Sequence, residues 1–322
     1  MKLLITGASG FIGTNFVQHY SNSDYQILNV DIQRPLNPLH QPHWAFGDIM
    51  DAPGLETILA NFGPTHIIHM AARADCDENT TVEDGYAVNT VGTENVLRAI
   101  RKTPTVERVI VVSTQYVSGP SRLPIHDEDY FPHTVYGQSK VITEQLARKA
   151  DLDCTWAVVR PTNVWGPWHY RYRSEAWRVI NKGMYFHPGW KPVVRSYGYV
   201  GNVVWQMNEI LTAPPDVVDH QVFYVGDRPI DIYHWVNAFS VALRQKPARR
   251  VPRYLLAPIG QFGDLFVKTG KNFPLTSSRF KNMISDYRVP IDNTFEAFGD
   301  PPYSLQEGVE ETVAWLEHTG WE

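Results

Sequence analysis

Short apolar runs alternate with helical patterns along the first half of the chain. Helix-like patterns cover residues 11–21, 84–101 and 135–149. The runs that read as strands are KLLIT (2–6), YQILNVD (25–31), HIIHMAA (66–72), RVIVVST (108–114) and CTWAVVRP (154–161). Runs that are apolar at nearly every position are typical of a parallel sheet covered on both faces by helices. The alternation therefore predicts an α/β fold with a doubly wound parallel sheet.

The amino-acid composition of the sequence changes after Trp165. Residues 164–177 and 185–199 are dense in aromatic residues, prolines and arginines, as expected of a lobe that lines a cleft. The expected domains are a first domain at 1–165, rejoined by about 195–226, and a smaller α/β substrate-binding lobe at 166–194 and 227–322.

Composition and charge exclude some classes of protein. With 43% hydrophobic and 20% charged residues among 322, the chain is expected to fold into a globular protein large enough for two lobes. Its net charge of −5 argues against nucleic acid or a membrane as the main partner, although a local basic pocket for a phosphorylated small molecule stays open. Cys76 and Cys154 have neither disulfide nor metal-site spacing, so we expect no metal site and a reducing compartment. The chain starts without a signal-peptide core and has no run of ~18 apolar residues, so a cytoplasmic protein is expected.

A glycine-rich turn follows the first predicted strand. ITGASGFIG closes this strand and opens a helix, with Gly7, Gly10 and Gly13 spaced three residues apart. Glycines here permit a close approach of the backbone to a ligand, and a helix N-terminus presents N–H groups to a pyrophosphate. The second strand ends in Asp31, 18 residues after Gly13, where a carboxylate can accept hydrogen bonds from both ribose hydroxyls. Together these features predict a Rossmann-like dinucleotide-binding domain.

Asp31 also bears on which dinucleotide binds. A carboxylate at this position repels a 2′-phosphate, so NAD is favoured over NADP as the cofactor. Arg34 argues the other way, although an arginine before Pro35 in a loop is usually solvated. Asp48, in GDIMD, has two interpretations that the sequence leaves open. It could hydrogen-bond the adenine amine, or it could cap the helix that begins with APGLETIL.

The stretch YGQSK places Tyr136 and Lys140 one turn apart on the same face of the helix expected at 135–149. An isolated pair of this kind is usually an exposed contact without function. The strand RVIVVST, however, delivers Ser113 and Thr114 at its carboxyl end, where the ligands of open α/β sheets bind. In such a site, a neighbouring ammonium and a cofactor cation would lower the pKa of the tyrosine, so that it could act as a base.

Over nearly its whole length the chain resembles the extended short-chain dehydrogenase/reductases, and within them the NAD-dependent nucleotide-sugar epimerase/dehydratase family. The matching segments occur in order: GASGFIG (7–13), VD (30–31), GDI (47–49), HMAA (69–72), NTVGTENVLRA (89–99), STQYVSG (113–119), YGQSK (136–140) and RPTNVWGP (160–167). The resemblance implies that Thr114, Tyr136 and Lys140 form the catalytic triad. The positions that match residues around the dinucleotide are Gly7, Gly10, Phe11, Ile12, Asp31, Asp48, Ile49, Ala71, Ala72, Asn89, Ser113, Tyr136, Lys140, Pro161 and Thr162.

The resemblance also implies residues that bind a nucleotide-diphosphate sugar. Asn163 would touch the diphosphate, and Arg195 would grip the nucleotide phosphate. Arg171 lies in an alternation of arginines and tyrosines, a pattern that suits phosphate recognition. His169 and His187 lie in aromatic-rich loops, so acid–base or phosphate-binding roles compete with plain packing.

Departures from the family pattern concern the sugar. In the dehydratase branch an aspartate and a glutamate follow the catalytic threonine, whereas Gln115 and Tyr116 stand here, so 4,6-dehydration is disfavoured. After HMAA, the usual hydrophobic stretch is replaced by one that holds Arg73, Asp75 and Asp77. Arg73 and Gln115 are therefore further candidates for contact with the substrate.

We expect an NAD-dependent nucleotide-sugar epimerase, acting at C4 through a transient keto-sugar, with Tyr136 as the base. Two alternatives stay open. One is an NAD(H)-dependent nucleotide-sugar dehydrogenase or keto-sugar reductase that uses the same residues, and the other is a non-catalytic NAD-binding scaffold. The resemblance further implies polysaccharide biosynthesis as the setting, and a homodimer formed through the helices at about 84–101 and 135–149.

Overall fold

The computed structural model describes residues 1–267, 273 and 275–321, and these fall into two compact units. Unit 1 comprises Met1–Val164, Val200–Gly226 and Val289–Pro302. Unit 2 comprises Trp165–Tyr199, Asp227–Arg288 and Tyr303–Glu322. No helix among the described residues is both long enough and apolar enough to span a lipid bilayer.

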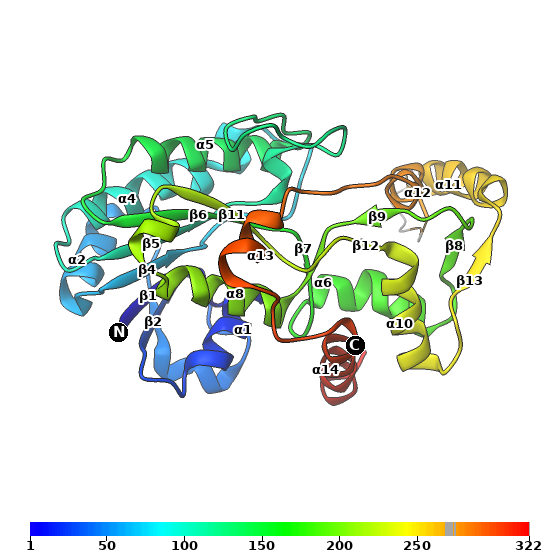
Figure 1. Ribbon diagram of the computed structural model, residues 1–322, viewed down its shortest axis with the longest axis horizontal. Coiled ribbons are helices and arrows are strands. Elements are labelled where there is room, and N and C mark those ends of the chain that lie inside the picture. The colour runs from blue at the N-terminus through cyan, green and yellow to red at the C-terminus, as the bar shows by residue number, and fades with distance from the viewer. Residues whose placement is uncertain (268–272, 274, 322) are drawn as a thin grey trace. The chain divides into compact units, whose positions relative to one another are not determined.

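Unit 1 is built on a seven-stranded sheet with the order β11-β6-β5-β4-β1-β2-β3 (Figure 1). Its strands are β1 (Lys2–Thr6), β2 (Gln26–Asp31), β3 (Trp44–Phe46), β4 (His66–His69), β5 (Arg108–Val112), β6 (Thr155–Pro161) and β11 (Gln221–Val225). All neighbouring strands run parallel. From β1 the chain builds outward through β2 and β3 on one side, and β4, β5, β6 and β11 lie on the other. The predicted doubly wound, Rossmann-like α/β fold is thereby confirmed.

Helices cover both faces of this sheet. They are α1 (Phe11–Tyr20), α2 (Ala52–Phe62), α3 (Val82–Gly85), α4 (Thr93–Arg101), α5 (Val135–Lys149), α8 (Val200–Thr212), α9 (Pro215–Val218) and α13 (Asp292–Phe298), with shorter helical turns at η1 (Pro38–His43), η2 (Val88–Gly92) and η3 (Gln115–Val117). On one face α2 packs beside α4 and α4 beside α5, and on the other α1 packs beside α8 (Figure 1). One hydrophobic core fills the space between the sheet and the first of these layers, with Leu4, Val109 and Val158 from the strands against Leu59, Val96 and Ile100 from the helices.

The expected helix at 84–101 is interrupted. The structure has α3, then the π-helical turn η2, and only then α4. The carbonyl oxygen of Asn89 accepts hydrogen bonds from the hydroxyls of Thr93 (2.8 Å) and Thr143 (2.6 Å). Side chains that bond to a backbone carbonyl compete with regular helical hydrogen bonding, which explains the irregular turn at this point.

Unit 2 is smaller and rich in aromatic packing. Its strands are β8 (Phe186–Pro188), β9 (Val194–Arg195), β10 (Tyr197–Tyr199), β12 (Ile230–Asp231) and β13 (Arg249–Val251), and its helices are α6 (Tyr170–Tyr172), α7 (Arg178–Asn181), α10 (Ile232–Arg244), α11 (Arg253–Val267), α12 (Ser277–Ile284) and α14 (Leu305–Thr319), with the π-helical turn η4 (Arg173–Trp177). β7 (Asn163–Trp165) runs across the division between the units. α10 lies against α7 and α14. Trp165 and Trp177 are fully buried and both contact the buried ring of Phe239, so these aromatic residues form a core where the sequence suggested a cleft lining.

Residues 289–302 belong to unit 1, whereas the sequence analysis placed all of 227–322 in the second lobe. Val289, Ile291 and Phe295 cluster with Tyr224 of β11. The hydroxyl of Thr294 also donates to the carbonyl oxygen of Tyr224 at 2.7 Å. This segment therefore covers the last strand of the sheet, an arrangement that its own amphipathic pattern does not reveal.

Candidate active site

The carboxyl ends of four central strands of unit 1 lie at one edge of the sheet. Thr6 pairs with His69, and His69 with Val111, so β1, β4 and β5 end in register. Val112 pairs with Val159, two residues before β6 ends. The segments that follow these strands hold most of the predicted site residues. The edge between β1 and β4 is also where the strand order reverses, the place at which open α/β sheets bind their ligands.

The glycines after β1 form a cradle of bare backbone. Gly7 has φ +79°, and a Cβ built on it would lie 2.5 Å from the Cα of Ala71, in the segment after β4. A Cβ on Gly13 would lie 2.3 Å from the Cα of Ala8. Gly10 is the N-cap of α1, and Phe11 and Ile12 are its first residues. Backbone that packs this closely at a helix N-terminus fits the diphosphate of a dinucleotide, which is the role expected for this turn.

Asp31 ends β2 and faces the same turn. Its carboxylate accepts hydrogen bonds from the backbone N–H groups of Ser9 (3.1 Å) and Gln33 (2.9 Å), which fix its orientation. Asp48 accepts from the N–H of Met50 at 2.8 Å. The N-cap of α2 is Asp51, whose side chain accepts from Gly54, so capping does not account for Asp48. The bond to Met50 closes a local turn, and the contact of Asp48 with adenine stays a prediction.

Two buried hydroxyls lie where strands of the sheet end. The Oγ of Ser113 follows β5 and the Oγ1 of Thr162 follows β6, and neither has a hydrogen-bond partner among the described residues. Buried polar atoms are almost always hydrogen-bonded in folded proteins, so orphaned hydroxyls call for a ligand. Pro161, Ala72 and Ile49 complete the predicted cofactor set, and Ile49 is buried beside Gly92. The glycine cradle, Asp31 and these hydroxyls together fit a bound dinucleotide.

Tyr136 lies in the first turn of α5, which Thr134 caps by accepting a hydrogen bond from the N–H of Gly137 at 2.9 Å. The tyrosine is buried, and burial raises its pKa above the usual value, while a hydrogen bond with the Thr114 side chain acts in the opposite direction. The lowered pKa expected from the sequence depends on a neighbouring ammonium and a cofactor cation. In the protein alone, burial is the largest effect on the pKa of the phenol.

Lys140 is also buried, one turn further along α5, and is 1% exposed. Burial lowers its pKa to about 8, while the nearby carboxylate of Glu144 favours the charged form. Glu144 is itself bound by the guanidinium of Arg160, with 2.7 Å between Nη2 and Oε2, and both side chains are buried. Lys140 is therefore held in the interior with a pKa close enough to neutrality for proton exchange.

Asn89 holds three segments of the site together. Its Oδ1 accepts from the backbone N–H of Arg73 (2.8 Å), and its Nδ2 donates to the backbone oxygen of Arg73 (3.0 Å) and to the hydroxyl of Ser139 (2.9 Å). Ser139 in turn donates to the backbone oxygen of Tyr136 at 2.7 Å. Both ends of the Asn89 amide thus bind protein, so its visible role is to position the loop after β4 against α5.

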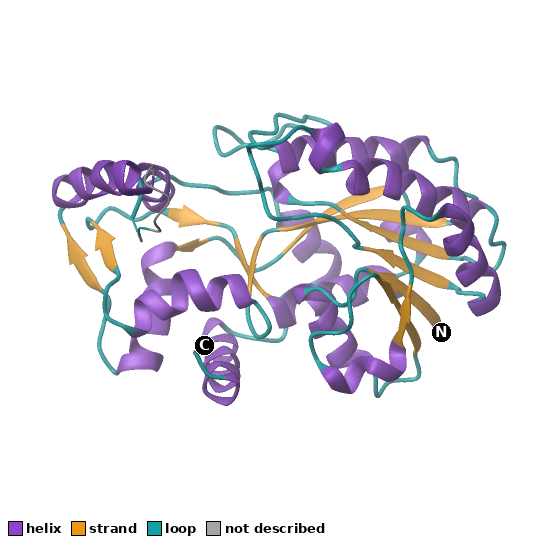
Figure 2. Cartoon of the chain, turned by 180° about the vertical axis from the view of Figure 1, so that it is seen from behind, coloured by secondary structure: helices purple, strands orange, loops and turns teal. Residues whose placement is uncertain are grey.

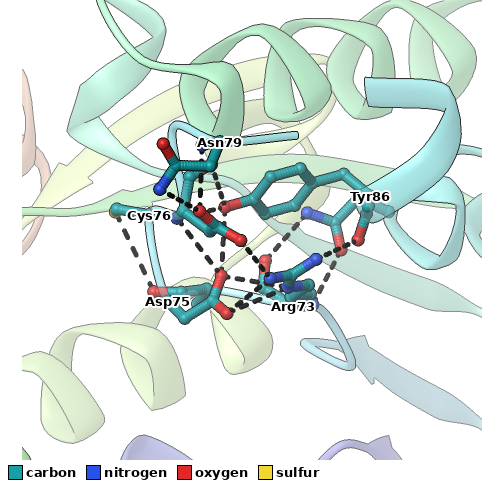
Figure 3. A network of polar contacts seen from close by, with 9 residues as sticks. Arg73, Asp75, Cys76, Asn79 and Tyr86 are labelled. Carbon is teal, nitrogen blue, oxygen red and sulfur yellow. Dashed lines mark hydrogen bonds and ion pairs between the residues drawn. The ribbon is translucent and has the colours of Figure 1, made fainter. Parts of the chain in front are cut away.

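Arg73 is engaged with carboxylates of its own loop (Figure 3). Its guanidinium contacts Asp75 at 2.8 Å and Asp77 at 3.1 Å. The hydroxyl of Tyr86 donates to Asp75 (3.0 Å) and accepts from the backbone N–H of Asp77 (2.8 Å). The ring of Tyr86 lies 6.1 Å from that of Tyr136, centroid to centroid. Arg73 thus stabilises its own loop, and Tyr86, which is bonded to this loop, packs against Tyr136. Its expected contact with the substrate stays a prediction.

The residues after Thr114 line the other side of Tyr136. The ring of Tyr116 meets that of Tyr136 edge to face at 6.3 Å, and its hydroxyl donates to Oδ1 of Asn163 at 3.2 Å. Gln115 is buried. Tyr86 and Tyr116 were not identified as site residues from the sequence, because a tyrosine gives no local signal of which distant ring it will meet.

His69 at the end of β4 is a second residue that the sequence did not single out. It is buried, with its ring nitrogens 2.8 Å from the hydroxyl of Thr6 and 3.0 Å from that of Thr93. Burial lowers its pKa to about 3, and the charge of Lys140 acts in the same direction. It is thus a neutral histidine that links β1, β4 and α4 behind the site.

The remaining candidates belong to unit 2. Arg171 is exposed and lies 3.4 Å from Glu175, and Arg195 donates to the backbone oxygen of Asn282. His169 caps α6 by accepting from the N–H of Tyr172 at 3.1 Å. His187 is buried beside the hydroxyl of Tyr185 at 3.2 Å. Both histidines thus have a structural role, since His169 caps a helix and His187 packs against Tyr185.

Similarity to known proteins extends over nearly the whole chain. Residues 3–226 match the sequence model of the "NAD dependent epimerase/dehydratase family". The chain is similar to an N-acetyl-alpha-D-glucosaminyl-diphospho-ditrans,octacis-undecaprenol 4-epimerase of Escherichia coli O157:H7, with 26% identity over 98% of this chain and 95% of that protein. It is also similar to a UDP-glucose 4-epimerase of Vibrio cholerae, with 29% identity over 97% and 94%.

Solved structures show the same fold. The UDP-glucose 4-epimerase of Thermotoga maritima, solved with UDP-glucose, superposes with a TM-score of 0.76 and 21% identity, over 99% of each chain. The UDP-glucuronic acid 4-epimerase of Bacillus cereus has a TM-score of 0.72 and 18% identity, over 99% of this chain and all of that one. The family match covers more than half of the sequence and includes the cradle, the triad and Asn89. The chain is therefore an enzyme of the NAD dependent epimerase/dehydratase family, with NAD as its cofactor.

Proposed function

We propose that this enzyme is a 4-epimerase that acts on a sugar carried by a nucleoside diphosphate. The observation that carries the proposal is the arrangement of Thr114, Tyr136 and Lys140 at the carboxyl edge of the sheet, where Tyr136 and Lys140 are buried on one helix beside the glycine cradle. The full-length similarity to two 4-epimerases supports the choice of reaction.

In the proposed reaction, Tyr136 moves one proton. As the phenolate, Tyr136 removes the proton of the sugar's C4 hydroxyl, and Thr114 shares the hydrogen bond to that hydroxyl. Lys140 favours the phenolate by its charge. When bound, NAD supplies the position that accepts the C4 hydrogen as hydride and later returns it. Tyr136 then returns its proton to the carbonyl oxygen after the keto-sugar has presented its other face, so that neither protons nor electrons are gained overall.

Gln115 and Tyr116 support epimerisation over dehydration. Loss of water from a sugar needs an acid and a base beside the threonine, and near neutral pH neither an amide nor a phenol serves in place of a carboxylic acid. Gln115 is buried and Tyr116 is bonded to Asn163, so both are built into the wall of the site. The proposed chemistry is therefore confined to oxidation and reduction at one carbon.

The carrier of the sugar is the second point to be tested. A nucleoside diphosphate is the carrier that we propose, with Asn163, Arg171 and Arg195 as its candidate contacts. One relative acts on a sugar attached to undecaprenyl diphosphate, so a polyprenyl diphosphate is the competing carrier. A homodimer through α4 and α5 is also proposed, and light scattering at several concentrations would test it, since a purely monomeric mass contradicts it.

The reaction can be tested on the purified enzyme. The protein is denatured and the supernatant assayed for released NAD, and the native enzyme is then incubated with UDP-, GDP-, dTDP- and CDP-sugars and with a polyprenyl diphosphate sugar. Bound NAD, a C4-epimeric product and no net absorbance of reduced nicotinamide are the expected results. A steady absorbance change that requires added NAD or NADH would instead identify a dehydrogenase or reductase, and a protein that binds NAD without turnover would be a scaffold.

A further inference from the structure

Helix α11 of unit 2 exposes a continuous apolar face. Five apolar side chains on it are exposed by 43 to 74%, namely Tyr254, Leu255, Ile259, Phe262 and Leu265. The opposite side, with Leu256, Gly260 and Gly263, is buried, and the glycines lie against residues 275–277 at the start of α12. Figures 1 and 2 show α11 beside α12. A helix at a protein surface normally turns its polar side outward, and α11 does not.

A tryptophan lies next to the start of this helix. Trp190 is 60% exposed and follows Gly189, whose N–H donates to the backbone oxygen of Val251 at 2.7 Å. The guanidinium of Arg253 donates to the backbone oxygen of Pro188 at 3.3 Å. These bonds place the loop of Trp190 beside the first residues of α11. Tryptophan is enriched where a protein meets the headgroup level of a membrane.

The segment around α11 is strongly basic, although the chain as a whole is acidic. Residues 244–288 contain ten lysines and arginines and two acidic residues, in a chain with 29 basic and 34 acidic residues. This segment is thus +8 and the remainder is −13. Arg249 in β13 and Lys281 in α12 are exposed, and Arg253 begins α11. The argument from net charge against a membrane therefore does not apply to this part of the molecule.

We propose that the apolar face of α11 docks on the surface of an anionic lipid bilayer. The exposed aliphatic and aromatic side chains enter the boundary between headgroups and acyl chains, and the flanking arginines and lysines meet the lipid phosphates. α11 has 15 residues, and at ~1.5 Å per residue it is about 22 Å long. The hydrocarbon core of a bilayer is about 30 Å thick, so the helix lies along the surface.

A second copy of the chain fits this face less well. In a twofold dimer the same patch meets itself, so the exposed basic residues beside α11, such as Arg249 and Lys281, would lie close to their copies and repel them. Gln261 is the polar residue of α11 that is exposed, whereas protein interfaces carry about one hydrogen bond per 100–200 Å². Charge and composition thus favour lipid over protein as the occupant.

Vesicle sedimentation of the full-length enzyme tests the proposal. The vesicles are phosphatidylcholine, with and without phosphatidylglycerol. The double variant Leu255→Glu and Leu265→Glu alters α11, and Leu39→Glu with Leu123→Glu is the matched control, because these leucines are 82% and 50% exposed in unit 1. We expect the wild type and the control to sediment with anionic vesicles, weakly with neutral ones, and less as salt rises. The α11 pair should bind at least about tenfold more weakly.

Several results would overturn the proposal. One is a wild type that stays in the supernatant with anionic vesicles, and another is an α11 pair that binds as the wild type does. A third is an α11 pair that changes the oligomeric mass in light scattering without any vesicle binding by the wild type, which would make the face a protein interface. The docking does not depend on the proposed reaction. Turnover of a UDP-sugar in the absence of lipid should be unchanged in the α11 pair, so failure of either proposal is visible separately.

Discussion

The ring of Tyr86 lies against that of Tyr136, with 6.1 Å between their centroids, while the Tyr86 hydroxyl is held by Asp75 and by the backbone of Asp77. Tyr86 is fully buried, and Arg73 pairs with both aspartates. Tyr136, the base of the proposed reaction, therefore packs against Tyr86, and hydrogen bonds from a charged loop fix the position of Tyr86. A loop of this kind can act on the rate without touching substrate, which makes Tyr86 a positioning residue.

Replacing Tyr86 with phenylalanine keeps the ring contact and removes the hydrogen bonds. We expect kcat to fall by up to roughly thirtyfold, since two hydrogen bonds worth about 1 kcal/mol each are lost, while the dissociation constant for NAD stays unchanged. Steady-state kinetics and NAD titration measure the two quantities. Tyr25→Phe, which removes a hydroxyl bonded to Asn208, is the matched control and should leave kcat alone. A Tyr86 variant that lost only thermal stability would mean that the network is structural.

Replacing Tyr136 with phenylalanine removes the proposed base. Because the ring remains to fill its buried position, folding and NAD binding should be retained, while kcat falls by about 10² to 10⁴. Single-turnover formation of the keto-sugar, followed by nicotinamide absorbance, isolates the step. Turnover at the wild-type rate in this variant would exclude Tyr136 as the base.

Lys140 should make the stability of the protein depend on pH. Its pKa is lowered by burial from 10.5 to about 8, so between these pH values the unfolded chain holds a proton that the folded chain has released. The free energy of unfolding therefore rises with pH across this window, by up to about 3 kcal/mol. Below pH 8, where the buried ammonium is charged in both states, Lys140→Met should be more stable than the wild type by a similar amount. Urea unfolding at pH 7 and pH 10, after removal of bound nucleotide, measures the difference, and equal differences at the two pH values would contradict it.

His69 should make the free energy of unfolding depend on pH at the acid end of the range. Its pKa is lowered by burial from 6.5 to about 3, so below pH 6.5 the unfolded chain takes up a proton that the folded chain does not. Stability attributable to His69 is thus present above pH 6.5 and is lost as the pH falls toward 3, by up to about 5 kcal/mol. His69→Gln should flatten this part of the curve in urea unfolding, whatever its effect at pH 7. A slope that is unchanged by the substitution would show that other groups cause the acid sensitivity.

The sheet could be predicted because its strands are buried on both faces and therefore appear in the sequence as continuous apolar runs. All five residues of β5 are buried, which is the simplest case. The turn after β1 was predictable for a similar reason, since Gly7 has a positive φ and no room for a Cβ. Burial of a strand and the conformation of a turn constrain the residue types at those positions, so both can be recognised in the sequence.

Other parts of the site depend on contacts between distant residues. The capping of α2 by Asp51 rather than Asp48 is decided by a shift of three residues, which is within the uncertainty of helix boundaries predicted from a sequence. Asp75 and Asp77, which pair with Arg73, lie within four residues of it in the sequence. Whether these carboxylates bind the guanidinium depends on how the loop packs against Tyr86, which the sequence does not show. The raised pKa of Tyr136 likewise follows from burial by tertiary packing, which the spacing of Tyr136 and Lys140 does not encode.

The discontinuity of unit 1 imposes an order of assembly on the nascent chain. β6 pairs along one side with β5, and its other side pairs with β11, whose residues are synthesised about sixty positions later. Until β11 leaves the ribosome, β6 is an apolar edge strand with unpaired backbone groups, the kind of edge that recruits other chains. The cofactor cradle is complete long before this edge is covered. Binding of NAD to the emerging chain would therefore hold the first strands together during the interval in which the protein is most prone to aggregate.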